Sequence, residues 1–373
     1  WQLLTVSQQL FLKIDVPIDR KQEVSMKEKN ATIVDVAKLA EVSVATVSRV
    51  VNGNYPVKLE TKERVQAAIE TLRYVPNVQA RELNTRRSST IGVVVPSLYN
   101  MFFAEVIDGI EESVRKDGFS LLLNCAKNDP QQEMNCINAL VSRNVSGIIV
   151  ISPNTANIRE SFYEDLVRRM PLVFINGYHR ITNVSYVGND EKMGSEQALE
   201  YLRGLGHKRI LFVRGAHSDS YTIKEETYRQ FMAEKLQLDE SFIVNIGEGN
   251  GVDTVDSTMT RLMEVIPKCE PTAILCCNDL MGVGSLNACK RLGRKVPADI
   301  SVMSYDNISL SRLVEPKLTT MDQNMFQLGS NAASLLVEKI KGGHSKRITL
   351  DNILITREST GPVRGIAANS LMS

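Results

Sequence analysis

Short, strongly apolar segments alternate with helical stretches from Ile91 to Ser304, and this alternation limits the possible folds more than any other feature. The apolar segments cover 91–96, 119–124, 147–152, 172–176, 209–214, 242–246, 273–277 and 300–304. Such segments are typical of parallel strands buried on both faces. Helical stretches lie near 102–116, 131–142, 158–169, 190–204, 223–237, 253–266 and 279–292. The sequence therefore predicts an α/β body of two lobes, each a doubly wound parallel sheet.

Two lobes of this kind create one ligand-binding cleft where they face each other. Ligands of open parallel sheets bind beyond the carboxyl ends of the strands, so both lobes contribute residues to this cleft. A helix over 323–341 and a strand over 348–356 remain, and we expect them to cross back between the lobes. The expected domain bounds are 91–188 plus 323–350 for the N-lobe, 189–322 plus 351–358 for the C-lobe, and 359–373 for a tail.

The segment from Thr32 to Asn52 predicts a helix-turn-helix within a small all-α head at 26–75. Thr32 followed by Asp35 is a helix-capping signature, and the apolar positions after it recur at helical spacing. Ser43 ends a short turn and can cap a second helix over 44–51. A third helix over 60–72 is needed to complete a small core. Lys58 stands where a Ser or Thr cap would be expected, so we expect Thr61 to cap that helix instead.

The segment 76–90 is expected to form a hinge between the head and the body. Pro76 ends the preceding helix, and Asn77 can cap one further short helix over 77–84. An isolated helix of this length is marginal in water because helix nucleation is costly. We therefore expect the hinge to be disordered alone and helical with a partner.

Charge is unevenly distributed over the 373 residues, although the net charge is only +1. Residues 26–90 hold 11 Lys/Arg against 7 Asp/Glu, a surplus of four, whereas 91–373 net to −3 because 1–25 is neutral. A basic head on a slightly acidic body suits a nucleic-acid reader attached to another module. No apolar run approaches the ~20 residues of a membrane span. The six cysteines lack disulfide or C-x-x-C spacing, so we expect a cytoplasmic protein with reduced thiols.

Residues 1–25 precede Met26 and carry neither a positive start nor a small-residue cleavage site. We expect them to be a non-native or disordered leader.

The span from Thr32 to Glu358 resembles the lac repressor/galactose repressor (LacI/GalR) family of transcription regulators. The resemblance is carried in chain order by TIVDVAKLAEVSVATVSRVVNG, YVPNVQARELNTRRSSTIGVVVP, LGHKRILFV, CNDLMGVGSLNACKRLGRKVPADISVMSYDN and PKLTTMDQNMFQLG. It implies a helix-turn-helix head, a hinge helix and a periplasmic-binding-protein-like effector domain. It also implies a homodimer on a near-palindromic double-stranded DNA operator, and a small-molecule effector such as a sugar, a sugar acid or a sugar phosphate.

The resemblance places the second helix of the head in the major groove of the operator. Val44 and Ala45 can read only shape and the thymine methyl group, whereas Arg49 can pair with O6 and N7 of guanine. Two alternatives remain open, namely that Val44 belongs to the head core and that Arg49 contacts a phosphate. Thr46 and Ser48 are expected to contact phosphates. The family pattern implies further DNA contacts at Thr32, Ser43, Asn52, Tyr74, Asn77, Ala80 and Arg81.

Leu83 is an apolar residue within the polar hinge. The resemblance implies that the paired leucines of a dimer wedge between central base pairs in the minor groove and kink the duplex. The alternative is that Leu83 only packs against the partner's hinge.

The resemblance places effector contacts at strand ends that line the cleft, namely Phe102, Phe103, Asn176, Asn278 and Asp306. Aromatic rings can stack on a sugar-like face, and carboxylate and amide groups can bond its hydroxyls with strong discrimination. Asn176 and Asn278 have helix capping as an alternative role. Lys224 aligns where the family usually has an arginine, and it can either bind an anionic group or be a solvated helix residue.

Catalysis finds no support in the sequence. His179, His207, His217 and His344 are scattered without H-E-x-x-H or G-x-S-x-G patterns, and no Walker A sequence or metal-ligand cluster occurs. We therefore expect no enzyme activity, no cofactor and no metal, and a structural role for His207 in a turn. Two other functions stay open. One is a catabolite-control regulator with a phosphorylated carrier protein as co-effector, and the segment 99–119 would suit either kind of regulator. The other is a sugar-binding transport component.

Overall fold

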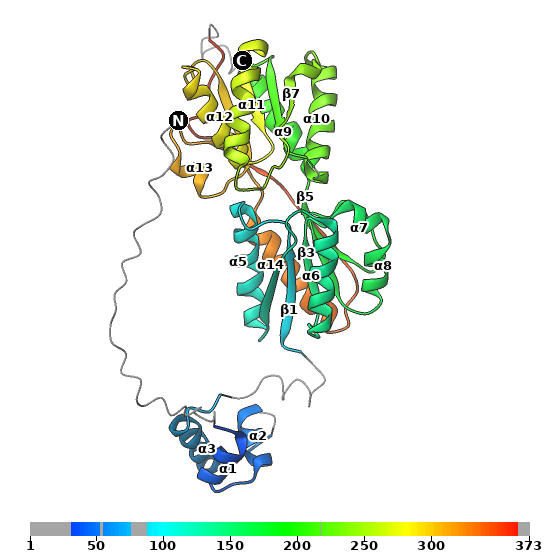
Figure 1. Ribbon diagram of the computed structural model, residues 1–373, viewed down its shortest axis with the longest axis vertical. Coiled ribbons are helices and arrows are strands. Elements are labelled where there is room, and N and C mark those ends of the chain that lie inside the picture. Colours follow the sequence, from blue (N-terminus) through cyan, green and yellow to red (C-terminus); the bar gives the residue numbers. More distant parts are fainter. Residues whose placement is uncertain (1–30, 53–54, 76–87, 217, 365–373) are drawn as a thin grey trace, which may run out of the picture. The chain divides into compact units, whose positions relative to one another are not determined.

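The computed structural model describes residues 31–52, 55–75, 88–216 and 218–364 (Figure 1). The chain divides into two compact units, a head within Trp1–Thr85 and a body within Arg86–Ser373. Within the described ranges, no helix combines the length and the apolarity needed to cross a membrane. The six cysteines are free thiols.

The head packs three helices, α1 (Ile33–Leu39), α2 (Val44–Asn52) and α3 (Leu59–Thr71). Thr32 caps α1 as predicted, because its backbone N–H donates to Asp35 Oδ2 at 2.9 Å while its own Oγ1 accepts from the Asp35 N–H. Glu41 turns the chain toward α2 with a φ of 54°. The buried core consists of Val36, Ala37, Ala40, Val47, Val65 and Ala68. The predicted helix-turn-helix with a third supporting helix is confirmed.

The start of α3 differs from the prediction. The helix begins at Leu59, and Lys58 occupies the N-cap position without a side-chain hydrogen bond. The backbone closes the first turn without that bond, since the Lys62 N–H donates to the Lys58 carbonyl at 3.0 Å. Thr61 lies inside the first turn, so the prediction that Thr61 caps this helix is wrong.

The N-lobe of the body is a six-stranded sheet in the order β11-β5-β4-β3-β1-β2, with parallel strand pairs throughout. Its strands are β1 (Thr90–Val95), β2 (Ser120–Cys125), β3 (Ile148–Ile151), β4 (Leu172–Ile175), β5 (Ser185–Asn189) and β11 (Arg347–Leu350). Its helices are α5 (Met101–Lys116), α6 (Pro130–Ser142), α7 (Thr155–Arg159), α8 (Phe162–Val167) and α14 (Met325–Ile340).

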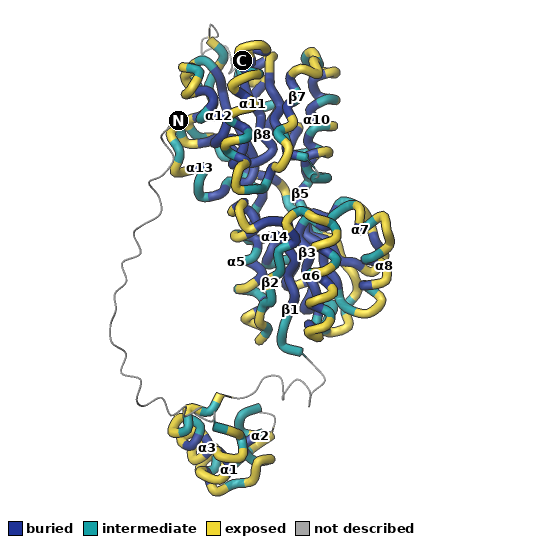
Figure 2. The backbone as a smooth tube through the Cα atoms, viewed as in Figure 1, coloured by how far each residue is buried: buried dark blue, intermediate teal, exposed yellow. Residues whose placement is uncertain are grey.

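Both faces of the N-lobe sheet are buried by helices. Val93 of β1 belongs to a core shared with α5 and α14, whereas its neighbour Val94 belongs to a core shared with α6 and α8. Successive strand residues point to opposite faces, so a strand that is apolar at every position requires this double cover. Figure 2 shows the dark, buried strands of the lobe enclosed by partly exposed helices.

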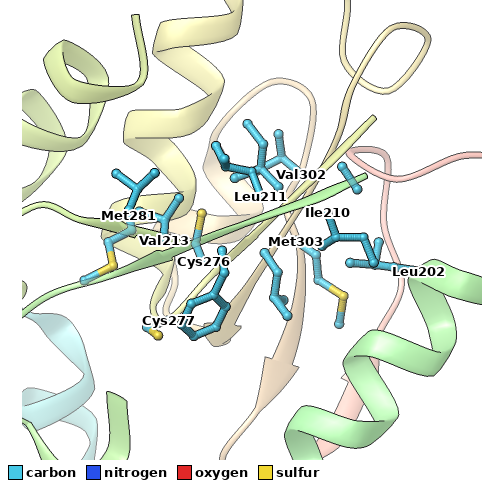
Figure 3. Packing of buried hydrophobic residues seen from close by; sticks show 14 of the residues in the cluster. Leu202, Ile210, Leu211, Val213, Cys276, Cys277, Met281, Val302 and Met303 are labelled. Atoms are coloured by element: carbon cyan, nitrogen blue, oxygen red, sulfur yellow. The ribbon is translucent and has the colours of Figure 1, made fainter. Parts of the chain in front are cut away.

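The C-lobe repeats this design with the strand order β12-β10-β9-β8-β6-β7, parallel except for the β10–β12 pair. Its strands are β6 (Ile210–Arg214), β7 (Ile243–Asn245), β8 (Ala273–Cys276), β9 (Ser301–Asp306), β10 (Thr319–Asp322) and β12 (Ile353–Ile355). Its helices are α9 (Glu191–Gly204), α10 (Asp219–Lys235), η1 (Glu240–Phe242), α11 (Thr254–Cys269), α12 (Asp279–Arg291) and α13 (Leu310–Leu313). Figure 3 shows part of its apolar core around β6, β8 and β9. The predicted fold class is confirmed.

Three details of the body were not predicted. The strands β5 and β10 were missed because their sequences, SYVGN and TTMD, mix polar with apolar residues. The single strand predicted over 348–356 is two strands, β11 and β12, which belong to different sheets. The helix predicted over 158–169 is interrupted at Ser161, which has a φ of 60° and separates α7 from α8.

The chain continues into the C-lobe beyond the predicted boundary at Glu358. Ser359 is fully buried, and its Oγ donates to the Val302 carbonyl at 2.6 Å. The segment 359–364 is therefore part of the lobe rather than of a tail, and it carried no apolar pattern that could have indicated this.

Three connections link the two lobes, from β5 to α9, from β10 to α14 and from β11 to β12. An asparagine in each connection donates a hydrogen bond to another of the three. Asn189 donates through Nδ2 to the Gln323 carbonyl at 3.0 Å. Asn324 donates to the Asp351 carbonyl at 2.9 Å, and Asn352 donates to the Asp190 carbonyl at 3.0 Å. Through these three bonds, each connection is hydrogen-bonded to both of the others.

Candidate nucleic-acid interface and ligand cleft

The outer face of α2 presents the residues predicted to read bases. Val44 has 41% of its surface exposed, Ala45 and Arg49 are also exposed, and Val47 is fully buried in the core. Ala45 and Arg49 lie on one side of the helix because residues four apart are neighbours, and Val44 is exposed at the start of the same helix. The alternative that Val44 belongs to the head core is wrong.

Other residues predicted to contact DNA also make contacts within the head. Ser43 Oγ accepts from the Thr46 N–H at 3.1 Å and lies 2.9 Å from Thr46 Oγ1, so it caps α2 as predicted. Asn52 Nδ2 donates to Ser48 Oγ at 3.1 Å. Tyr74 packs against the head core. The DNA contacts of these residues stay predictions, and the predicted sites Asn77, Ala80, Arg81 and Leu83 lie outside the described residues.

An inner chamber lies between the two lobes of the body. Its lining includes every residue predicted to contact an effector: Phe102, Phe103, Asn176, Lys224, Asn278 and Asp306. They come from opposite sides of the cleft, since the first three belong to the N-lobe and the others to the C-lobe. The structure thus brings together residues that are up to 204 positions apart in the sequence.

The two phenylalanines form one aromatic wall of the inner chamber. Asn100 caps α5 by accepting the Phe102 N–H at 3.0 Å, which fixes both rings on the first turn of the helix. The ring centroids lie 5.4 Å apart with an interplanar angle of 88°, an edge-to-face arrangement. Because the rings are perpendicular, only one of them can stack flat on a given ligand ring.

Asn278 lines the chamber, but both donors of its side-chain amide are used within the protein. Its Oδ1 accepts from the Met281 N–H at 2.9 Å, so it caps α12. Its Nδ2 donates to Tyr221 Oη at 2.9 Å and to the Gly249 carbonyl at 2.7 Å. An amide has two donors, and both are used. The capping alternative for Asn278 is therefore confirmed.

Asn176 differs from Asn278, since it follows β4 without starting a helix. It has a φ of 53° and is 8% exposed, and its buried Oδ1 has no hydrogen-bond partner among the described residues. A buried acceptor without a partner is costly. The capping alternative is wrong for Asn176, and its side chain is free to accept a bond from a ligand.

Asp306 ends β9 with a φ of 108° and is 4% exposed. Its Oδ1 accepts from Gln323 Nε2 at 2.6 Å, and its Oδ2 accepts from Asn100 Nδ2 at 3.4 Å. Burial, together with the nearby Asp279 carboxyl, raises the pKa of Asp306 well above its ordinary value. A protonated carboxyl can both donate and accept, which suits the hydroxyl groups of a polyol.

Lys224 is only 1% exposed, so the solvated alternative for this residue is wrong. Its Nζ lies 3.0 Å from Glu191 Oε2, donates to Ser220 Oγ at 2.8 Å, and sits 4.5 Å from the Tyr305 ring centroid. Burial alone would lower the pKa of Lys224, but the Glu191 carboxylate and other nearby groups outweigh it and raise the pKa. Lys224 is thus a cation whose charge is already balanced inside the protein.

A larger outer chamber adjoins the inner one and shares Phe103 and Asn176 with it. Of the residues that the structure describes, four with carboxyl side chains and no lysine or arginine line it: Asp129, Glu133, Asp219 and Glu248. Two hydrogen bonds cross between the lobes at this level, from Asn128 Nδ2 to Glu248 Oε1 at 3.0 Å and from Thr155 Oγ1 to Asp219 at 2.7 Å. The mouth of the cleft is acidic.

Several groups that shape the cleft were missed by sequence reasoning. Asn100, Gln323 and Asn250 hold or contact the predicted residues, and Glu191 balances Lys224. Asn100 directly precedes α5 and caps it, so capping could have indicated this residue. Nothing in the sequence links Glu191 to Lys224, because they belong to different helices.

A DNA-reading head joined to a two-lobed ligand cleft defines an effector-responsive, sequence-specific transcription regulator. The chain belongs to the lacI family of bacterial regulatory proteins, whose DNA-binding model matches residues 32–77. A periplasmic-binding-protein-like domain model matches residues 199–360. These matches do not favour the transport component that the sequence left open.

Relatives and solved structures agree with this family. The chain is 33% identical to catabolite control protein A of Priestia megaterium, over 83% of this chain and 92% of that protein. It is 35% identical to the transcriptional repressor PurR of Vibrio atlanticus, over 85% and 95%. Its structure resembles the lac repressor dimer bound to operator and the anti-inducer ONPF, with a TM-score of 0.77, 27% identity and coverage of 89% and 100%. It also resembles the regulator CelR in complex with cellobiose, with a TM-score of 0.65, 28% identity and coverage of 88% and 99%.

Proposed function

We propose that this regulator is a cytoplasmic, non-catalytic repressor of carbohydrate-related genes that acts as a homodimer on a near-palindromic operator. The observation that carries the proposal is the inner chamber, where an aromatic wall faces amide and carboxyl groups suited to hydroxyls. The CelR relative bound to cellobiose supports the same ligand class.

On the DNA side, Arg49 pairs with guanine, and Val44 and Ala45 contact thymine methyl groups. The exposure of these three residues on α2 supports this assignment. A few base contacts from each head give modest discrimination, since each good contact contributes about 1–3 kcal/mol. Specificity then depends on the second head of the dimer and on the hinge.

The effector is an uncharged sugar rather than a sugar acid or a sugar phosphate. Lys224 is the one lysine or arginine that lines either chamber within the described residues, and its charge is already balanced by Glu191. An anionic ligand would also have to pass the carboxyl groups of Asp129, Asp219 and Glu248 in the outer chamber. The fourth carboxyl, Glu133, is buried, and burial raises its pKa. Like charges in a confined, partly dry site repel strongly.

A matched ligand panel tests this assignment. Each neutral hexose is compared with its 6-phosphate and its uronic acid, and the readout is the affinity for an operator that the protein itself selects from random duplex DNA. We expect a neutral member to change operator affinity about 5- to 150-fold, the usual range of such coupling. Asp306→Asn should remove this response while leaving operator binding without ligand unchanged. A response to phosphorylated members alone would contradict the assignment.

A phosphorylated carrier protein as co-effector is the second candidate, and the likeness to catabolite control protein A favours it. The surface of α5 argues against it, because Asp108 and Glu111 are exposed there. The cations Arg115 and Lys116 on this helix pair with Glu111 and Glu112 at 3.2 Å and 2.7 Å. Capture of a phosphorylated carrier by the intact protein, but not by a variant with α5 charges reversed, would support this candidate instead.

A further inference from the structure

Tyr55 is a large aromatic residue that takes no part in the folded core of the head. It is 68% exposed and does not belong to the apolar cluster formed by α1, α2 and α3. Its hydroxyl has no hydrogen-bond partner among the described residues of the head. The stability of the head therefore gives no reason for an aromatic ring at this position.

The Tyr55 ring instead contacts the guanidinium group of Arg49. The Arg49 Cζ atom lies 5.7 Å from the centroid of the ring, within the range of a cation–π contact. Among the described residues, the Arg49 side chain makes no hydrogen bond and no ion pair. The ring of Tyr55 is thus the contact that restricts the end of this long side chain on the exposed face of α2.

We propose that Tyr55 is a positioning residue that holds the Arg49 guanidinium ready for its contact with guanine. This inference rests on the proposed reading of guanine by Arg49. A guanidinium group meets O6 and N7 of guanine through two parallel hydrogen bonds, so its plane must have one orientation. A flexible arginine loses rotamer freedom when it binds, and a ring that already restricts it reduces that loss.

A positioning role affects specific binding and leaves non-specific binding alone. Random DNA is bound through phosphates, which accept a cation in many orientations. Loss of an exposed cation–π contact should weaken binding to the selected operator about two- to five-fold. The competing role for Tyr55 is a phosphate contact through its hydroxyl, and that role would weaken binding to every duplex alike.

The experiment uses the full chain and an operator that the wild-type protein selects from random duplex DNA. Affinities for this operator and for random duplex are measured by fluorescence anisotropy for Tyr55→Phe, Tyr55→Ala, Arg49→Ala and the double variant Arg49→Ala/Tyr55→Ala. Tyr55→Phe is the matched control, because it keeps the ring and removes the hydroxyl. Circular dichroism checks that each head is folded.

We expect Tyr55→Phe to match the wild type and Tyr55→Ala to lose about two- to five-fold on the operator only. Tyr55→Ala should cost nothing more once Arg49 is alanine. Three results would each overturn the positioning role. Tyr55→Ala could lose affinity equally on both duplexes, Tyr55→Phe could bind the operator as weakly as Tyr55→Ala, or the affinity losses could add up in the double variant. If Arg49→Ala itself leaves the operator preference intact, the proposed guanine contact fails, and with it the role of Tyr55.

Discussion

Lys224 and Glu191 form an ion pair whose side chains are 2% and 1% exposed. Tyr178 Oη and Ser220 Oγ each donate to Glu191 Oε1 at 2.7 Å, so the carboxylate is held from both lobes. The family pattern could predict that position 224 faces the cleft. It could not predict the state of the lysine, because the partner lies on another helix and follows no spacing rule.

Lys224→Met should destabilise the body strongly, because it leaves the buried Glu191 carboxylate without its counter-charge. Removing one partner of a buried pair costs about 3–5 kcal/mol of unfolding free energy. The double variant Lys224→Met/Glu191→Gln should recover much of this loss, since no unpaired charge remains. Urea unfolding followed by circular dichroism measures all three proteins. A single variant that costs less than about 1 kcal/mol would show that the pair is not buried in solution.

At the scale of elements, His207 joins the turn after α9 to the edge of β9. Its Nε2 lies 3.0 Å from Ser301 Oγ and 3.1 Å from the Gly361 carbonyl, and its Nδ1 lies 3.1 Å from Thr272 Oγ1. Burial lowers the pKa of His207 from 6.5 to about 4, an effect only partly offset by the Gly361 carbonyl. The folded protein therefore keeps this ring neutral where the unfolded chain protonates it.

The lowered pKa of His207 determines the direction in which folding stability changes with pH. Between pH 6.5 and about 4 the unfolded chain binds a proton that the folded chain does not, so His207 makes stability fall as pH falls. Asp279, whose pKa burial raises to about 7, acts in the opposite direction over this range. A comparison with His207→Gln isolates the histidine. The stability difference between the two proteins should change by about 2–3 kcal/mol between pH 7.5 and 4.5. An equal stability difference at both pH values would contradict the lowered pKa of His207.

The helices α5 and α14 approach each other closely at two glycines. A Cβ on Gly109 would lie 2.1 Å from the Phe326 carbonyl oxygen, and a Cβ on Gly329 would lie 2.0 Å from that of Val106. Both obstacles are backbone atoms, so the helices themselves would have to separate.

Gly109→Ala should therefore destabilise the body by about 1–3 kcal/mol through overpacking. Gly204→Ala in α9 is the matched control, because nothing lies within 4 Å of its added Cβ. There the substitution should stabilise by up to about 1 kcal/mol, since alanine favours helix. Thermal unfolding of both variants gives the comparison. Equal effects at the two positions would mean that helix propensity, rather than the close approach, decides the outcome.

Elements with a continuous apolar pattern could be predicted from the sequence, and those without it could not. The strand β3, with the sequence IIVI, is buried at every position, and its apolar run indicated a strand. The strand β10, TTMD, is largely buried too, but its threonines are satisfied by long-range bonds such as that from Thr320 Oγ1 to Asp279 Oδ1 at 2.8 Å. Burial through polar contacts leaves no periodic signal, because the partners are distant in sequence.

At the scale of the whole molecule, function depends on a link between the cleft and the DNA-reading head. Asn189, Asn324 and Asn352 tie the three connections between the lobes into one set. In the proposed function, a ligand in the cleft would add contacts between lobes that already bond through Thr155 and Asp219. Sequence reasoning could assemble the cleft from strand ends, but it could not show which amides were free, because that depends on partners such as Tyr221 and Gly249.

Reciprocity between the two sites tests this link most directly. A neutral sugar identified with the matched panel is titrated into the full-length protein with and without saturating operator, and its dissociation constant is measured by calorimetry. Linkage requires the ratio of these two constants to equal the factor by which the sugar changes operator affinity. We expect a common factor between about 5 and 150. A dissociation constant for the sugar that is the same with and without operator would contradict a link between the cleft and the head.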